Sequence, residues 1–260
     1  MQLFRWSTGR DPEGPRNLVV RPGCRKLLPG TQKRARFSGF NLTICAVIFW
    51  LVRHGETADN ASRVFQGHFG QGLNKRGQAQ AARLAERLKR SVPSPDRIVA
   101  SDLDRAFETA SIVGQAMGLP VEKDADLREV DVGAWTGRGY DEVKELFPEE
   151  WAAWDRGLDV RRGGGETYGE LAERMDRAIA RVYEGSASGT GWALLVSHGG
   201  AIKSWIAKIL GVSEAGLRAL GGVANTGITI VERDDRGRHR LHCWNDVAHL
   251  DGLVVDEDSD

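Results

Sequence analysis

Apolar residues along the chain follow two different periods. The runs at 47–52 and 192–196 contain no polar residue, which is typical of strands buried on both faces of a sheet. In several longer segments, apolar residues instead recur every three or four positions, as on one face of a helix. These patterns predict helices over residues 74–90, 103–117, 167–182 and 201–210, short strands at 97–100 and 121–122, and a hairpin built from 227–231 and 240–244.

Strand and helix segments alternate along most of the chain, which predicts an α/β fold. Such repeated units form three α/β/α layers, in which a mostly parallel sheet carries helices on both faces. Residues 133–165 interrupt the alternation with many glycines and with Trp135, Trp151 and Trp154, so we expect a lid-like insertion over the sheet edge. The spacing of Phe147, Trp151 and Trp154 places them on one side of a helix, either as a local mini-core or as a surface that contacts substrate.

The composition excludes several classes of protein. The chain has 260 residues, a hydrophobic fraction of 41% and 36 basic and 36 acidic residues. It can therefore bury a sizeable core, and its zero net charge argues against a disordered chain and against a nucleic-acid partner. The longest apolar run, residues 42–52, is too short to span a bilayer, so we expect no membrane partner. Three scattered cysteines, Cys24, Cys45 and Cys243, favour a reducing compartment and hence a cytoplasmic location.

Charge is distributed unevenly between the ends of the chain. Residues 1–45 hold nine Lys or Arg and two acids, a net charge of +7, and show no helical or strand period. We expect a disordered or weakly attached basic arm there, a folded domain over 46–250 and an acidic tail over 251–260. A targeting peptide, a nucleic-acid arm and a membrane-surface tether are alternative interpretations of the arm, as is a start of translation near Val47.

Chemistry-bearing residues follow the two buried strands. The first strand leads into Arg53-His54-Gly55, and the second leads into Ser197-His198-Gly199. Ligands of open α/β sheets bind beyond the carboxyl ends of the strands, and glycine lets the backbone approach them closely. Arg105 lies near the start of the helix that follows another strand, where free N–H groups favour anions. Two arginines and two histidines at neighbouring strand ends therefore predict a phosphate site.

The order of these residues resembles a known family. Arg53-His54-Gly55-Glu56-Thr57 resembles the N-terminal signature of the histidine phosphatase superfamily, which has the phosphoglycerate mutase-like fold. Five blocks fit in order across roughly residues 47–231, which makes chance agreement negligible. Beyond the signature, the fitting residues are Asn60; Phe65-Gln66-Gly67, Leu73-Asn74 and Gly77-Gln78-Ala79; Ser101, Leu103, Arg105-Ala106 and Thr109-Ala110; Leu127-Arg128-Glu129 and Gly133-Ala134-Trp135-Thr136-Gly137; and Val196-Ser197-His198-Gly199-Gly200.

The resemblance implies a role for each residue of the site. A neutral imidazole is a good nucleophile toward phosphorus, and His54 is the expected nucleophile. Arg53, Arg105 and His198 would bind the equatorial phosphoryl oxygens, while Glu129 would protonate the leaving oxygen and then accept a proton from water. The phosphate cradle is expected to be completed by Asn60, by the backbone of Gln66 and Gly67, and by Gly199. Glu56, Thr57 and Thr109 are expected to hold the loop.

No cofactor or metal is expected. His239, His242 and Cys243 could suggest a metal site, but the two histidines lie three residues apart on a predicted strand and so point to opposite faces. The two arginines and His198 already supply cationic charge to the reaction. The expected partner is a small-molecule phosphate ester, and the sequence leaves a homodimer open.

Among the functions that fit this site, we favour phosphomonoester hydrolysis through a phosphohistidine. Cofactor-dependent mutases of the family carry a longer, basic middle insertion, whereas here 69 residues separate Glu129 from His198 and the insertion is acidic. Phosphoglycerate mutase-type transfer and a non-catalytic sugar-phosphate sensor remain as alternatives. The C-terminal residues 220–222, Asn225 and Trp244-Asn245 look like those of actinobacterial phosphatases that act on sugar-linked phosphoglycerate, so a sugar phosphate or a phosphoglycerate derivative is an expected substrate.

Overall fold

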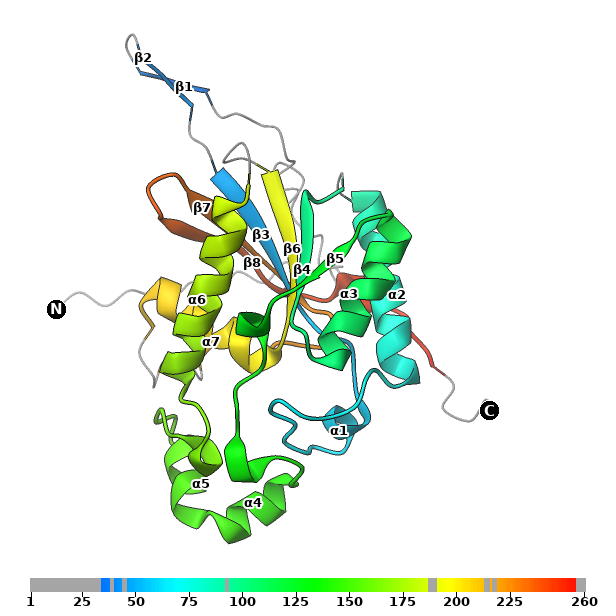
Figure 1. Cartoon of the computed structure of the whole chain (residues 1–260), viewed down its shortest axis with the longest axis vertical. Helices are drawn as coiled ribbons and strands as arrows, with labels where there is room; N and C mark the ends of the chain where they lie inside the picture. Colours follow the sequence, from blue (N-terminus) through cyan, green and yellow to red (C-terminus); the bar gives the residue numbers. More distant parts are fainter. Residues whose placement is uncertain are drawn as a thin grey trace, which may run out of the picture.

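A single mixed sheet forms the centre of the domain. The computed structural model describes residues 46–91, 94–186, 191–212, 216 and 219–255, together with the backbone of 34–37 and 40–43. Within these residues, six strands pair in the order β5-β4-β6-β3-β7-β8 (Figure 1). The strands are β3 (Ala46–Arg53), β4 (Arg97–Ala100), β5 (Val121–Lys123), β6 (Gly191–Ser197), β7 (Ile228–Asp234) and β8 (His239–Asp246). The first four in this list run parallel, and the hairpin of β7 and β8 adds two antiparallel strands.

Helices cover both faces of the sheet, which confirms the predicted three layers. They are α2 (Lys75–Ser91) and α3 (Asp104–Met117) on one face and α6 (Tyr168–Glu184) and α7 (Gly199–Leu210) on the other (Figure 1). Alternate side chains of β3 enter the two cores: Ile48, Trp50 and Val52 pack with α2 and α3, while Val47, Phe49 and Leu51 pack with α6 and α7. Because β3 is buried on both faces, its sequence is an unbroken apolar run.

Helix ends follow the sequence signals. Asn74 accepts a hydrogen bond from the backbone N–H of Gly77 at 2.7 Å and so caps α2 as predicted. Thr167 and Glu170 form a capping box at the start of α6. Gly118 ends α3 with φ of 69°, a left-handed conformation that glycine adopts without strain. These ends fix where each loop leaves the helix layer.

The insertion lies beyond the carboxyl ends of the parallel strands, so its predicted position over the sheet edge is wrong. It consists of η3 (Gly133–Trp135), α4 (Tyr140–Leu146), α5 (Pro148–Asp155) and η4 (Arg162–Gly164), and α4 and α5 stand below the sheet in Figure 1. Its centre is Trp135, which is fully buried and contacts the rings of Phe147, Trp151 and Trp154. Clustering of these aromatic rings holds the insertion against the strand ends.

The first 45 residues fall mostly outside the described residues, as do 256–260 of the acidic tail. Two strands that the sequence analysis did not predict, β1 (Arg34–Phe37) and β2 (Phe40–Thr43), pair with each other as a separate antiparallel sheet. No helix in the described part of the chain has the length and apolar character needed to cross a membrane.

Deleting residues 1–44 tests whether the domain folds without the arm. The central sheet includes no strand from this segment, so we expect the free energy of unfolding to change by less than about 0.5 kcal/mol. Urea denaturation of the full chain and the truncated chain measures this difference. Hydrolysis of p-nitrophenyl phosphate, the activity that the family resemblance implies, should also be retained. A large loss of stability or activity would show that the arm is part of the fold.

Candidate active site

Two histidines meet at the ends of adjacent parallel strands. Arg53 of β3 is in register with Ser197 of β6, so the residues that follow them, His54 and His198, are neighbours. The backbone N–H of His54 donates to the carbonyl of Ser197 at 2.9 Å, and the two imidazole centroids are 5.1 Å apart. His54 is 2% exposed and His198 is fully buried. The strand pairing therefore brings the two predicted histidines together.

Hydrogen bonding selects the reactive nitrogen of His54. Its Nδ1 lies 2.7 Å from the carbonyl oxygen of Gly55, which can only accept, so Nδ1 carries the proton and Nε2 keeps its lone pair. Burial, together with the nearby charges of Arg53 and Arg105, holds the pKa of His54 well below its ordinary value of 6.5. The ring is thus neutral at physiological pH, as a nucleophile must be.

His198 is fully buried next to His54. Its Nε2 lies 2.9 Å from the hydroxyl oxygen of Ser101, and Nδ1 has no partner among the described residues. Burial and the charge of Arg105 lower the pKa of His198 well below 6.5 as well. Gly199 begins α7 and packs against the side chain of Arg53. His198 and Gly199 do not line the cavity at the strand ends, but they contact His54 and Arg53, which do.

Two arginines present positive charge to the cavity. Arg53 donates through Nη1 to the carbonyl of Val223 at 2.7 Å. Arg105 is 1% exposed and donates to the carbonyls of Phe69 at 2.8 Å and Gly67 at 2.7 Å. Burial lowers the pKa of Arg105 to about 10, which still leaves it charged at neutral pH. In both arginines the buried Nε lacks a partner among the described residues, which is the arrangement expected for binding an anion.

Glu129 sits at the amino end of helix α7. Its carboxylate accepts from the backbone N–H groups of Gly200 at 3.0 Å and Ala201 at 3.1 Å, and also from that of Val130 at 2.9 Å. The guanidinium of Arg174 donates to the Glu129 carbonyl oxygen at 3.0 Å and forms an ion pair with Glu166. These contacts fix the Glu129 carboxylate in the lining of the same cavity as His54, and its acid–base role stays a prediction.

The predicted phosphate cradle is present in part. The side-chain oxygen of Asn60 accepts from Asn225 at 3.2 Å and from the Thr57 N–H at 3.4 Å, so its amide N–H groups remain available as donors to the cavity. Gln66 instead donates through Nε2 to Thr57 and Asp59, both at 2.8 Å. Its side chain therefore holds the loop, while the predicted role concerns the backbone of Gln66 and Gly67, both of which line the cavity. Gly67 also lines the cavity and accepts from Arg105.

The loop residues act as the sequence analysis expected. Thr57 accepts from Gln66, while Thr109 accepts from the backbone N–H of Gly55 at 3.0 Å. Glu56 accepts from the side chain of Asn74 at 3.0 Å. Each of these bonds anchors the segment that follows β3 to a neighbouring element. The position of His54 is thereby fixed from both sides of the loop.

These groups surround one cavity of about 190 Å³. Strand-end residues form its floor, and the insertion forms the opposite wall. The lining residues are Arg53, His54, Asn60, Val64, Phe65, Gln66, Gly67, Arg105, Glu129, Val130, Val132, Tyr140, Trp154, Arg162, Tyr168 and Gly200. The cavity therefore combines a cationic floor with a partly aromatic wall.

Sequence reasoning missed two residues of the site. Asn225 donates to the carbonyl of His54 at 3.0 Å as well as to Asn60, and so connects the nucleophile to the cradle. Arg162, which is 2% exposed, reaches the cavity from the insertion. The sequence signal for Arg162 is an arginine pair directly before three glycines, residues 161–165.

The residues considered for a metal lie apart. His239 packs edge-on against Trp205, with ring centroids 5.3 Å apart, while Nε2 of His242 lies 2.8 Å from Glu232. Within the described ranges, no three His, Cys, Asp or Glu side chains come together as metal ligands.

Comparison with known proteins identifies the family. Residues 49–247 match the histidine phosphatase superfamily (branch 1), and the chain belongs to this family. It is 33% identical to phosphoglycerate mutase-like protein 4 of Arabidopsis thaliana over 84% of this chain and 93% of the relative. It is 36% identical to the probable phosphoglycerate mutase GpmB of Salmonella paratyphi C, over 80% and 97%. Mycobacterial glucosyl-3-phosphoglycerate phosphatase, solved with VO3, superposes with a TM-score of 0.70 at 32% identity, over 76% and 98%. The predicted recognition, fold and enzyme class are thus confirmed.

The low pKa of His54 predicts that the free energy of unfolding falls as the pH falls below 6.5. Below pH 6.5 the unfolded chain protonates this histidine while the folded chain does not, so the unfolded state binds more protons and stability falls as pH falls. His54→Asn keeps an N–H donor for the Gly55 carbonyl but cannot titrate. We expect the variant to lose less stability between pH 7 and pH 5, by about 1 kcal/mol per pH unit below 6.5. Urea denaturation at several pH values measures both slopes, and equal slopes would contradict the assignment.

Proposed function

We propose that the chain hydrolyses phosphomonoesters of small metabolites through a phosphohistidine on His54. The observation that carries the proposal is the hydrogen bond from His54 Nδ1 to Gly55, which leaves a neutral Nε2 beside two buried arginines. Membership of the histidine phosphatase superfamily supports the same assignment.

The reaction has two in-line steps. In the first, the Nε2 lone pair of His54 forms the N–P bond, the P–O bond to the alcohol breaks, and Glu129 in its acid form gives a proton to the leaving oxygen. Arg53, Arg105 and the amide of Asn60 stabilise the charge on the equatorial oxygens, with His198 behind His54. In the second, water attacks phosphorus, its proton passes to Glu129, and the N–P bond breaks. Phosphate and the starting enzyme result.

Names of the relatives suggest two substrate possibilities. The mycobacterial neighbour is a glucosyl-3-phosphoglycerate phosphatase, and the Salmonella relative is a probable phosphoglycerate mutase. We infer a phosphorylated sugar or a phosphoglycerate derivative as the substrate, with hydrolysis as the reaction. Mutase-type transfer is the second candidate, because the same phosphohistidine could return its phosphoryl group to another hydroxyl.

Replacing the nucleophile tests the reaction class. We expect His54→Asn to lower kcat for p-nitrophenyl phosphate by more than about 1000-fold, because His54 is the one histidine among the described residues that line the cavity. The enzyme is mixed with a phosphate ester that carries radioactive phosphorus and is then quenched rapidly. The label bound to the protein should be acid-labile in the parent and absent from the variant. A screen of phosphorylated metabolites, with a mutase assay on 3-phosphoglycerate alongside, separates hydrolysis from transfer. Activity of the variant within tenfold of the parent would remove His54 from this role.

The aromatic wall makes a second, independent prediction. Trp154 lines the cavity and contacts Trp135, whereas Trp151 contacts Trp135 without lining the cavity. Trp151→Ala and Trp154→Ala should both lower stability, by about 2 kcal/mol, but only Trp154→Ala should raise KM. The increase should be about tenfold for glucose 6-phosphate and much smaller for p-nitrophenyl phosphate. Thermal melts and steady-state kinetics of the matched pair measure this, and equal kinetic effects would mean that the wall is purely structural.

A further inference from the structure

Arg162 is a buried cation that the proposed reaction does not use. Its side chain is 2% exposed and lines the same cavity as Arg53, His54 and Glu129. Two of its buried nitrogens, Nε and Nη2, have no hydrogen-bond partner within the described residues. A charged group so far removed from water is costly unless an anion neutralises it. The position of Arg162 therefore points to an anionic ligand in the cavity.

Among the described residues, Nε and Nη2 of Arg162 have no partner, and these are the two nitrogens with which other arginines of this chain bind carboxylates. Arg97, Arg128 and Arg174 each donate through Nε and Nη2 to the two oxygens of one carboxylate, those of Glu122, Asp102 and Glu166, at 2.5–2.9 Å. Nε–H and Nη2–H are parallel and spaced to match two carboxylate oxygens. Arg162 presents this same pair of donors, so a carboxylate is the ligand that fits it best.

The backbone that carries Arg162 is fixed by close contact between two segments. Gly163 adopts φ of 57°, and a Cβ there would lie 2.5 Å from the backbone nitrogen of Ala134. A Cβ on Gly133 would lie 2.1 Å from the carbonyl oxygen of Gly163, so η3 and η4 touch backbone to backbone. Glu150 also accepts from the Gly163 N–H at 2.7 Å. These contacts therefore leave the backbone at Arg162 little room to move.

Tyr168 fixes the guanidinium itself. The guanidinium carbon of Arg162 lies 3.9 Å from the centroid of the Tyr168 ring, which also lines the cavity. Stacking of this kind holds the plane of the group while leaving its edge available. Preorganised donors bind tightly because little conformational entropy remains to be lost.

Arg162 lies on a different wall of the cavity from the two arginines that are proposed to bind phosphate. Arg53 and Arg105 come from the strand ends beside His54, where phosphoryl transfer would take place, whereas Arg162 comes from the insertion beside Trp154 and Tyr168. A cavity of about 190 Å³ suits a phosphate joined to a short alcohol. A second negative group on that alcohol would thus lie on the Arg162 side.

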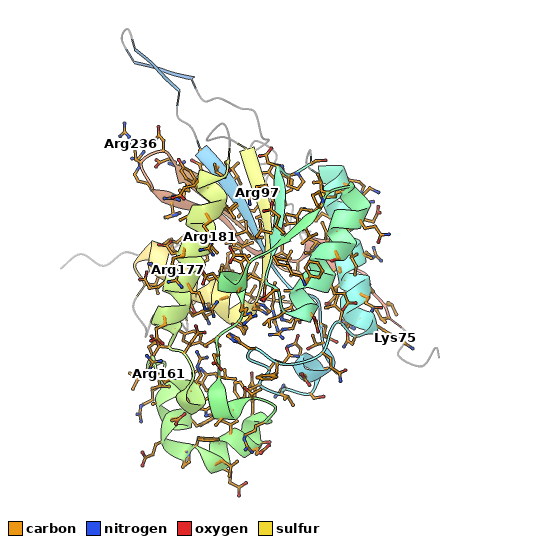
Figure 2. All side chains as sticks on the ribbon, in the orientation of Figure 1. Lys75, Arg97, Arg161, Arg177, Arg181 and Arg236 are labelled. Carbon is orange, nitrogen blue, oxygen red and sulfur yellow. The ribbon has the colours of Figure 1, made fainter. Side chains whose placement is uncertain are left out.

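We propose that Arg162 is a specificity residue that binds a carboxylate on the alcohol part of the substrate, so that phosphorylated hydroxy acids are preferred over phosphorylated neutral alcohols. This inference rests on the proposed phosphatase function and deepens it. Arg161 supplies the matched control, because it lies at the outer edge of the molecule (Figure 2), is 56% exposed and pairs with Glu170.

Two substrates that differ in one group test the proposal. In 3-phosphoglycerate a carboxylate replaces the CH2OH group of glycerol 3-phosphate. We expect the parent to favour 3-phosphoglycerate in kcat/KM, and Arg162→Gln to lose about 10- to 100-fold on it, the effect of a charged hydrogen-bonded pair. The same variant should change by less than about threefold on glycerol 3-phosphate and p-nitrophenyl phosphate, since the phosphate groups are untouched. Arg161→Gln should leave all three substrates unchanged.

Other outcomes are decisive in the opposite direction. Equal losses on the two glycerol compounds would overturn the proposal, as would a parent enzyme that does not favour 3-phosphoglycerate. An Arg162-dependent preference for fructose 1,6-bisphosphate over fructose 6-phosphate, without one for the carboxylate, would make a second phosphate the ligand and also overturn it. Should Arg162→Gln fail to fold, the parent still decides, because glycerate should inhibit p-nitrophenyl phosphate hydrolysis competitively and glycerol should not.

Failure of the underlying function would look different. If His54→Asn retained full activity on p-nitrophenyl phosphate, the phosphohistidine reaction itself would be wrong. The rise in melting temperature of the inactive His54→Asn protein on addition of 3-phosphoglycerate measures binding without turnover. This measurement therefore tests Arg162 separately from the reaction. Adding Arg162→Gln should remove most of that stabilisation for 3-phosphoglycerate and little of it for glycerol 3-phosphate.

Discussion

The parallel pairing of β3 with β6 is the contact on which the whole site depends. It places Arg53 opposite Ser197, and so it brings the rings of His54 and His198 together at the carboxyl ends of the two strands. Both strands are buried on each face, so the histidines emerge into a region shielded from water. Burial lowers the pKa of each ring, and neighbouring arginines lower it further. A fold that needs apolar strands for its core thereby also keeps His54 neutral, as the proposed reaction requires of its nucleophile.

Buried cations impose a second constraint on the surrounding loops. Among the described residues, Arg105 donates to no carboxylate and is instead held by the carbonyls of Gly67 and Phe69, while Arg53 is held by that of Val223. Carbonyl dipoles orient a guanidinium without cancelling its charge, whereas a carboxylate would compete with phosphate. The nearest acid in the site, Glu129, is directed to the N–H groups at the start of α7. The loops therefore hold the two arginines through carbonyl groups and fix the Glu129 carboxylate through backbone N–H groups.

Sequence patterns predicted those features that depend on local order. Apolar runs located β3 and β6, and the residues that follow these strands gave His54 and His198, because strand direction alone determines which end of the sheet they reach. Features that depend on distant contacts were not predictable in this way. The Gln66 side chain donates to Thr57 and Asp59 at the start of α1 (Ala58–Ala61), a helix of four residues that is too short to show a hydrophobic period in the sequence. The insertion was placed at the sheet edge, yet Trp135 and its aromatic neighbours hold it over the strand ends. Arg162 was missed because its burial arises from the contact between Gly133 and Gly163, which are thirty residues apart.

In the proposed function, reaction chemistry and substrate selection come from different parts of the chain. The strand ends supply His54 and Arg53, and Arg105 and Glu129 join them in the same cavity. Their sequence neighbours Val52, Ala106 and Val130 belong to the two cores, so the positions of these residues are coupled to the sheet. The insertion has its own small aromatic core around Trp135, so residues on its inner side can vary without disturbing the strands. Rigid support is needed on that side too, because a specificity group that moves freely gives up much of its binding free energy on ordering. The stacked Tyr168 and the touching glycines meet this need for Arg162. In the proposed function, an insertion that is separately stabilised and forms one wall of the cavity would set the substrate, while the strand ends keep the phosphoryl chemistry unchanged.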